Sequence, residues 1–226
     1  SDFRYRNTVL PKEGAALFIS QSGESLDTLM ALRHARAEGQ HIIGLVNVAE
    51  STIARESDVV LRTLAGPEIS VASTKAFTTQ LAILLSLAVD WAKKRNFLDE
   101  KGVSKIMNEL SRLPTVMGEV LSDSDRWNEC SNELAKARDV IYLGRGLNFP
   151  IALEGALKLK ELSYIHSEGY AAGEMKHGPI ALLEDGMPVV MVAPYDEWFE
   201  KTASNLREAL ARGGRVVLLS DRAGIE

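Results

Sequence analysis

The stretch that decides the fold of this chain is Ser20-Gln21-Ser22-Gly23-Glu24-Ser25. Residues 15–19, Ala-Ala-Leu-Phe-Ile, form an apolar run before it, and residues 26–33 follow with apolar side chains at helical spacing. The pattern predicts a buried strand that enters a Ser/Gly turn and then a helix. The first amides of such a helix have no partners within it, and they lie at the positive end of its dipole.

A turn of this kind suits a phosphate monoester, because hydroxyls and helix amides both donate to its oxygens. Gly23 permits a tight turn or a close approach to a ligand, and no lysine is present to form a Walker-type nucleotide loop. A small phosphorylated metabolite therefore fits better than a nucleoside triphosphate. The serines could equally serve only to cap the helix, since capping uses the same groups.

Composition excludes several classes of function. The chain has 226 residues, 46% of them hydrophobic, so it can bury a sizeable core. Its formal charge of -5 gives no global basic field, so we expect no nucleic-acid or membrane partner. Residues 81–89 form the longest apolar run, which is far too short to span a bilayer.

Cysteine and histidine usage narrows the chemistry further. A single cysteine, Cys130, excludes an internal disulfide framework and fits a reducing compartment, and the first residues lack the pattern of a signal peptide. We therefore expect a soluble cytoplasmic protein. The four histidines have no metal-ligand spacing, so we expect no metal, and we expect no cofactor.

Short apolar runs alternate with helical patterns along the chain, which predicts an α/β fold with parallel sheets flanked by helices on both faces, doubly wound as in flavodoxin and Rossmann folds. We expect a first unit at residues 1–98, a helical linker at 99–137 and a second unit at 138–226. The expected strands are 15–20, 42–48, 59–63, 140–143, 188–193 and 216–220, and the expected helices are 25–37, 74–95, 149–165 and 198–212.

The two units resemble each other. A shift of about 174 positions lays Ala16 on Val190, Gly39 on Gly213 and Ile42 on Val216, so that strand, helix, glycine cap and next strand coincide. The serine turn does not repeat. The second unit also opens with a strand and a helix that have no counterpart in the first, so we expect the first unit to lack its initial strand and helix.

A second polar cluster, residues 70–75, opens the long helix at 74–95. Ser73 or Thr74 could simply cap that helix. Alternatively the cluster forms a second wall of the phosphate site, because loops at the carboxyl ends of parallel strands converge on one edge. Glu68 and Lys75 would then lie near the ligand or in solvent.

The helix predicted at 149–165 carries a charged stripe. At about 100° per residue, Glu154, Lys158 and Glu161 share one face, between apolar shoulders that include Leu157 and Leu162. A charged stripe is often a solvent face with structural ion pairs. Between apolar shoulders it indicates a polar cleft, where a carboxylate can act as a base and a lysine can stabilise an enolate oxygen.

The polar, glycine-rich stretch at 167–179 contains His177 before Gly178-Pro179. An imidazole titrates near neutral pH, so His177 is a candidate proton donor, with a packed or surface histidine as the alternative.

These residues together resemble the sugar-isomerase region of the bacterial glucosamine-6-phosphate synthases. The resemblance covers nearly the whole chain, and the runs that carry it are 20–25, 66–78, 143–146, 152–161 and 176–179. The resemblance implies two sugar-isomerase (SIS) units, a homodimer, and an enzyme that converts fructose 6-phosphate and glutamine to glucosamine 6-phosphate.

The resemblance also implies roles for particular residues. Those that would hold the sugar phosphate are Ser20, Gln21, Ser22 and Ser25, of which the last is usually threonine in the family, and those that would line the sugar site are Val71 and Ser73. Glu161 would move a proton between C1 and C2, and Lys158 would assist at the adjacent oxygen. His177 would promote ring opening, in the family from the neighbouring subunit.

The family's enzymes carry further parts that we expect to be missing here, so we interpret the chain as a fragment. These are a glutaminase domain with a nucleophilic cysteine, which Cys130 cannot be, a first strand with a serine-bearing loop, and a tail whose lysine forms a Schiff base. Alone, the fragment should not complete the glutamine-dependent reaction. The alternatives are a non-aminating isomerase or deaminase for sugar phosphates and a sugar-phosphate-sensing module.

Overall fold

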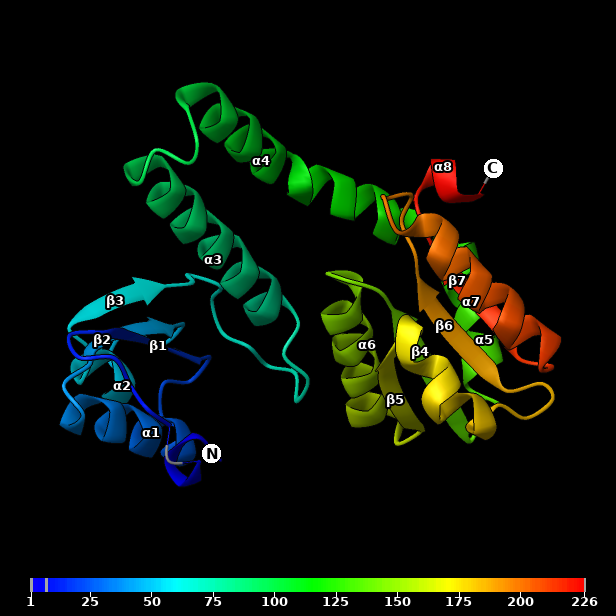
Figure 1. Ribbon diagram of the computed structural model, residues 1–226, viewed down its shortest axis with the longest axis horizontal. Helices are drawn as coiled ribbons and strands as arrows, with labels where there is room; N and C mark the ends of the chain where they lie inside the picture. The colour runs from blue at the N-terminus through cyan, green and yellow to red at the C-terminus, as the bar shows by residue number, and fades with distance from the viewer. Residues whose placement is uncertain (1, 7, 226) are drawn as a thin grey trace. The chain divides into compact units, whose positions relative to one another are not determined.

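The computed structural model describes residues 2–6 and 8–225. The chain divides into two compact units, residues 1–116 and 117–226, each built around its own parallel sheet (Figure 1). The two sheets confirm the expected α/β class.

The first unit holds a three-stranded sheet in the order β1-β2-β3, with all strands parallel. Ala15 pairs with His41 and Ile43 pairs with Val59. The elements are a 3-10 turn η1 (Asp2–Tyr5), β1 (Ala15–Ser20), α1 (Leu26–Ala37), β2 (His41–Val46), α2 (Thr52–Arg55), β3 (Val59–Arg62) and α3 (Lys75–Lys94); α4 (Glu100–Ser122) continues into the second unit.

Helices α1 and α2 cover the same face of the first sheet. Leu32 of α1, Ile42 of β2 and Ile53 of α2 are fully buried in one cluster. On the opposite face Leu45 is also fully buried, whereas Leu17 and Ile19 of the edge strand β1 are 36% and 42% exposed. The serine turn therefore follows an edge strand that is packed against α1 and α2 on one face and is partly exposed on the other.

The second unit holds a four-stranded parallel sheet in the order β5-β4-β6-β7. Figure 1 shows α6 and α7 flanking this sheet. The elements are α5 (Ser124–Leu134), β4 (Asp139–Gly144), α6 (Asn148–Ser163), β5 (His166–Ala171), the 3-10 turns η2 (Ala172–His177) and η3 (Pro179–Leu182), β6 (Pro188–Val192), α7 (Phe199–Ala211), β7 (Arg215–Leu219) and α8 (Arg222–Ile225).

Both faces of the second sheet are packed. On one face Val140 and Tyr142 of β4 contact Ala152 and Ala156 of α6. On the other face β4 and β6 pack against η2 and α7. The buried residues are Ile141 and Leu143 of β4, Val189 and Met191 of β6, Ala172 and Met175 of η2, and Ala209 of α7. This is the doubly wound arrangement that the sequence predicts.

All six predicted strands are confirmed within one or two residues, as are the four predicted helices. The sequence analysis missed β5, because its residues, His-Ser-Glu-Gly-Tyr-Ala, lack the apolar β-branched run that marks a strand. It also missed the one-turn helix α2. The helix predicted to end at residue 165 ends at Ser163, since Tyr164 takes a left-handed conformation with φ of 61° and stops it.

The internal repeat corresponds to β1–α1–β2 and β6–α7–β7. Gly39 and Gly213 follow α1 and α7 with φ of 81° and 86°, as the shared glycine cap requires. The strand register differs by one residue: Ala16 pairs with Ile42, whereas Val190 pairs with Val217 rather than with the aligned Val216. The repeat therefore holds for the elements but not for the exact pairing.

The close packing of α6 on β5 generates a stability prediction. A Cβ added at Gly169 of β5 would lie 2.9 Å from both Cα and N of Leu153, inside the helix backbone. Gly169→Ala should therefore destabilise the protein by about 1–3 kcal/mol, measured by urea denaturation followed by circular dichroism.

Gly118→Ala is the matched control, because Gly118 lies in α4 and an added Cβ meets nothing within 4 Å. It should raise stability by about 0.5–1 kcal/mol through higher helix propensity. Equal effects of the two substitutions would contradict the packing argument.

Candidate functional site

The serine loop, residues 20–25, leaves the carboxyl end of β1 and starts α1. Ser20 is buried; its Oγ accepts a hydrogen bond from Gly23 N at 3.0 Å and lies 3.5 Å from Ser25 Oγ. Ser22 Oγ accepts from Glu24 N at 3.2 Å. The structure thus brings three of the predicted phosphate ligands into one turn.

The N-terminus of α1 is not capped by its own serine. Ser25 is the N-cap residue, yet its side chain makes no capping hydrogen bond, and the helix ladder begins with Leu29 N donating to Ser25 O at 2.9 Å. The interpretation of Ser25 as a simple cap is therefore wrong for its side chain. A helix start surrounded by hydroxyls is the arrangement that binds phosphate elsewhere.

The loop is held in shape by the segment that follows β2. Asn47 N donates to Gln21 O at 3.1 Å, and Ile53 N donates to Gly23 O at 3.0 Å. Gly23 has φ of 66°, and a Cβ there would overlap the side chain of Ser51, so glycine is required. Two backbone hydrogen bonds from the segment after β2 thus hold the turn in the absence of a ligand.

Glu24 adds a side-chain clamp that the sequence analysis missed. Its carboxylate accepts from Thr52 N at 2.6 Å and from Thr52 Oγ1 at 2.8 Å. These hydrogen bonds lower the pKa of Glu24, so it is ionised at neutral pH. The partner, Thr52, is the first residue of α2, the helix that was not predicted. Ser51 and Thr52 after the second strand are the local sequence pattern that could have indicated a helix start there.

The second polar cluster lies in the loop before α3. Thr74 occupies the N-cap position of α3, as one of the two expected alternatives has it, but its side chain makes no capping hydrogen bond. The carboxylate of Glu68 instead accepts from Thr74 N at 3.3 Å and from Ala76 N at 3.1 Å. One oxygen of the partly exposed Glu68 thus binds the start of α3.

Val71 is 94% exposed, and Ser73 is half-buried. Within residues 2–6 and 8–225 no hydrogen bond joins this loop to the serine loop. No described hydrogen bond therefore joins either predicted lining residue to the predicted phosphate ligands.

The charged stripe of α6 forms a connected group. Lys158 Nζ donates to Glu161 Oε2 at 2.6 Å and lies 3.5 Å from Glu154 Oε1. The three side chains are only 23–31% exposed, whereas Leu157 and Leu162 beside them are 41% and 60% exposed. A solvent face would show the reverse order, so this stripe has the partial shielding expected of a site.

Electrostatics assign Lys158 a definite protonation state. Partial desolvation alone would lower its pKa, but the hydrogen bond to Glu161 and the charges of Glu154 and Glu161 outweigh it and raise the pKa. Lys158 is therefore an ammonium group at neutral pH. It can donate a proton or stabilise an oxyanion, and it cannot accept a proton.

His177 is the last residue of η2 in the second unit and is exposed. Among the described residues, no hydrogen bond or ion pair links its imidazole to the α6 stripe. The structure therefore does not join His177 to Lys158 and Glu161 within this unit.

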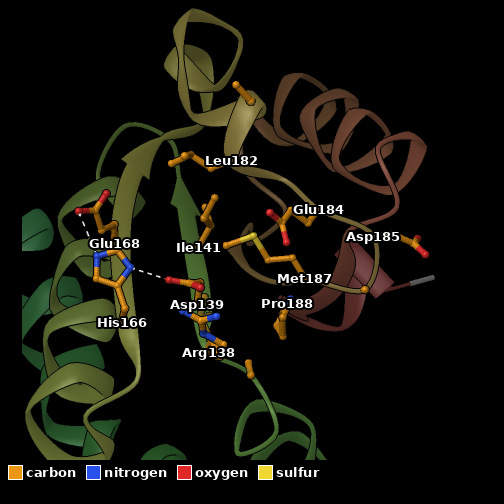
Figure 2. Close-up of a pocket in the computed structure, with 14 residues that line it drawn as sticks. Arg138, Asp139, Ile141, His166, Glu168, Leu182, Glu184, Asp185, Met187 and Pro188 are labelled. Atoms are coloured by element: carbon orange, nitrogen blue, oxygen red, sulfur yellow. Dashed lines mark hydrogen bonds and ion pairs between the residues drawn. The ribbon is translucent and has the colours of Figure 1, made fainter.

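A cavity of about 520 Å³ lies at the opposite edge of the second sheet, where β4, β5 and β6 begin. Figure 2 shows the residues that line it. His166 Nδ1 lies 2.9 Å from Asp139 Oδ1 there, and Nε2 lies 3.6 Å from Glu168 Oε1. None of the predicted site residues lines this cavity. Ligands of parallel α/β sheets bind at the carboxyl ends of the strands, so we do not assign the site to it.

Two absences concern only the part of the chain that the structure describes. No group of three or more His, Cys, Asp or Glu side chains is placed to hold a metal ion. No described helix is long and apolar enough to cross a membrane.

Fold and polar loops together define a protein of two parallel α/β units, each with its chemistry-bearing residues on β–α loops or on the helix that follows. The sequence model of the SIS domain family matches residues 1–90 and 133–224. The chain belongs to the SIS domain family.

Three similar proteins place the chain more closely. It is 58% identical over 226 residues to the glutamine–fructose-6-phosphate aminotransferase (isomerizing) of Bradyrhizobium diazoefficiens, covering all of this chain and 37% of that protein. The C-terminal domain of the glucosamine-fructose-6-phosphate aminotransferase from Francisella tularensis superposes with a TM-score of 0.95 at 44% identity, over 98% of this chain and 63% of that one.

A glucosamine-6-phosphate deaminase from Thermotoga maritima superposes with a TM-score of 0.80 at 26% identity, over 96% of this chain and 64% of that one. The chain thus spans little more than a third of the length of the curated relatives it matches. The expected membership of the SIS family and the likeness to the aminotransferases are confirmed.

The serine loop generates a binding prediction. Ser22→Ala removes a hydroxyl beside the helix start, so the affinity for inorganic phosphate should fall by about 10-fold, as for loss of one hydrogen bond to a charged group. Isothermal titration calorimetry measures the change. Ser111→Ala on the exposed face of α4, where the hydroxyl donates to Asn108 O, is the matched control and should bind as the unmodified protein does. Unchanged affinity of Ser22→Ala would assign the serines to the turn alone.

Proposed function

We propose that this chain is the sugar-phosphate isomerase region of an enzyme that makes glucosamine 6-phosphate from fructose 6-phosphate and glutamine-derived ammonia. The observation that carries the proposal is the serine loop at the start of α1, whose N-cap serine leaves its hydroxyl out of the cap. The names of the aminotransferases most similar to this chain support the choice of substrate and product.

In the proposed site Ser20, Gln21, Ser22 and Ser25 hold the sugar phosphate. The hydroxyls and the first amides of α1 neutralise the phosphate locally, which a chain of formal charge -5 requires because its overall field repels anions. Val71 and Ser73 line the sugar. The exposure of Val71 fits a residue that is covered only when substrate is bound.

The proposed chemistry is a proton transfer between C1 and C2 of the sugar. Glu161 accepts the proton as general base and returns it to the neighbouring carbon. Lys158, held as an ammonium group 2.6 Å from Glu161, stabilises the negative charge that develops on the adjacent oxygen. The close ion pair also keeps Glu161 aimed at one position, which proton transfer demands.

His177 completes the proposal as the group that promotes ring opening. Its exposure at the end of η2 suits a side chain offered to a second copy of the chain, so we assign the role to a homodimer in which each subunit supplies His177 to its partner. We also propose the boundaries 1–98 and 138–226 for the two SIS units, with a helical linker between. The glutaminase domain that supplies ammonia lies outside the proposed region.

A deaminase acting on glucosamine 6-phosphate is the second candidate, favoured by the likeness to the Thermotoga protein. The two activities differ in the nitrogen donor. Purified full-length protein that forms glucosamine 6-phosphate from glutamine and fructose 6-phosphate supports the synthase. Release of ammonia from glucosamine 6-phosphate with no glutamine-dependent synthesis would support the deaminase and overturn the first proposal.

Glu161→Gln in the full-length protein tests the catalytic assignment. Turnover should fall by about 10²-fold or more, because general-base catalysis contributes at least that much, while fructose 6-phosphate should bind nearly as before. Solvent deuterium should no longer enter the sugar, as followed by nuclear magnetic resonance.

Glu184→Gln is the control, since Glu184 lines the cavity at the opposite edge of the second sheet and should leave turnover unchanged. Near-normal turnover of Glu161→Gln would remove Glu161 from the role of base.

A further inference from the structure

A buried amide on α7 connects three parts of the second unit. Asn205 is 7% exposed, although its helix otherwise buries small or apolar residues on that face. An amide so placed is costly unless both its oxygen and its nitrogen are hydrogen-bonded. Asn205 Oδ1 accepts from Arg145 Nη2 at 2.8 Å, and Asn205 Nδ2 donates to Glu208 Oε2 at 3.3 Å.

Glu208 passes the connection on to η2. Its second oxygen, Oε1, lies 2.8 Å from Lys176 Nζ. The hydrogen bond from Lys176, and more weakly that from Asn205, lowers the pKa of Glu208 despite some desolvation. Glu208 is therefore ionised at neutral pH, and the polar chain Arg145–Asn205–Glu208–Lys176 is continuous.

The two ends of this polar chain meet at η2. Arg145 directly follows the last residue of β4, and a Cβ added at Gly173 would lie 3.2 Å from its Nη1, so the guanidinium rests against the η2 backbone. Lys176 holds the other end of the same six-residue turn. Between them Met175 is buried in the core beside α7.

His177 follows Lys176 directly and ends η2. Its own side chain is exposed, and Gly178, with φ of 155°, leaves the backbone after it free to turn. The orientation of the imidazole therefore depends on how firmly η2 is held. Misplacement of a reacting group by about 1 Å can cost up to ~10²-fold in rate.

We infer that Arg145, Asn205 and Glu208 are positioning residues that hold η2, through Gly173 and Lys176, so that His177 stands where ring opening needs it. The inference rests on the proposed function, in which His177 promotes that step. None of the three needs to touch the sugar. The polar chain acts on the exposed side of η2, at Gly173 and Lys176, whereas Ala172 and Met175 anchor its buried side in the core.

Asn205→Asp in the full-length protein cuts the chain with least change of shape. The carboxylate still accepts from Arg145, but it can no longer donate to Glu208 and repels it. Glu208→Gln is the second variant, because it weakens the bond to Lys176 without placing a new charge in the core. Thr202→Val is the matched control: Thr202 is equally buried on α7, and its hydroxyl donates to Trp198 O of its own helix.

Two substrates separate positioning from general damage. Fructose 6-phosphate must be opened before it reacts, whereas 5-deoxyfructose 6-phosphate lacks the hydroxyl that closes the ring and is already open. Both variants should lose about 10-fold or more in kcat with fructose 6-phosphate, with little change in KM. With the open analogue they should match the unmodified protein, as Thr202→Val should with both substrates.

His177→Asn, run in parallel, separates failure of the inference from failure of its premise. If His177→Asn loses turnover only with the closed sugar while Asn205→Asp and Glu208→Gln are unaffected, the positioning role is overturned. Equal losses with both substrates in the two variants would also overturn it, because they would report structural damage. If His177→Asn is itself unaffected, the proposed role of His177 fails and the inference fails with it.

Discussion

The parallel pairing of the strands is the constraint on which the rest of the structure depends. Because every strand of a sheet runs the same way, every β–α loop emerges at one edge, and the helix that follows turns its N-terminus toward that edge. The serine loop after β1 and the polar chain that starts at Arg145 after β4 occupy this edge of their own sheets. The parallel topology alone thus places side chains that are far apart in sequence at the carboxyl-end edge of their sheet.

In the first unit, carboxylates of the chain accept hydrogen bonds from amides at the starts of α2 and α3, whereas serine hydroxyls surround the start of α1. Glu24 accepts from the first amide of α2 at Thr52, and Glu68 accepts from Thr74 N at the N-cap of α3 and from Ala76 N in its first turn. Each of these two helix starts thus receives negative charge from within the protein. The start of α1 is surrounded by the hydroxyls of Ser20, Ser22 and Ser25, and the carboxylate of Glu24 in the same loop is turned to Thr52 of α2.

The sequence predicts the strands and helices well wherever burial imposes a period. It fails at the edge strand β5, which contacts α6 without apolar side chains. Ser167 Oγ donates to Ala156 O, and Gly169 packs against the backbone of Leu153. It also fails to pair residues across elements. The stripe on α6 is visible from helical spacing alone, but the bond from Thr52 to Glu24 and the link from Asn205 to Arg145 join residues 28 and 60 positions apart, and no local pattern marks them.

The charged stripe of α6 is less exposed than the leucines beside it. Charged side chains on a helix normally stand further out than their apolar neighbours, because water solvates them better than protein does. On α6 the charged group of Glu154, Lys158 and Glu161 lies deeper than Leu157 and Leu162. The ion pairs offset part of the cost of that placement, and they fix Lys158 as a cation. Partly shielded charges between more exposed leucines are what the proposed proton-transfer site on α6 requires, because shielding strengthens the interaction of Lys158 with a developing negative charge.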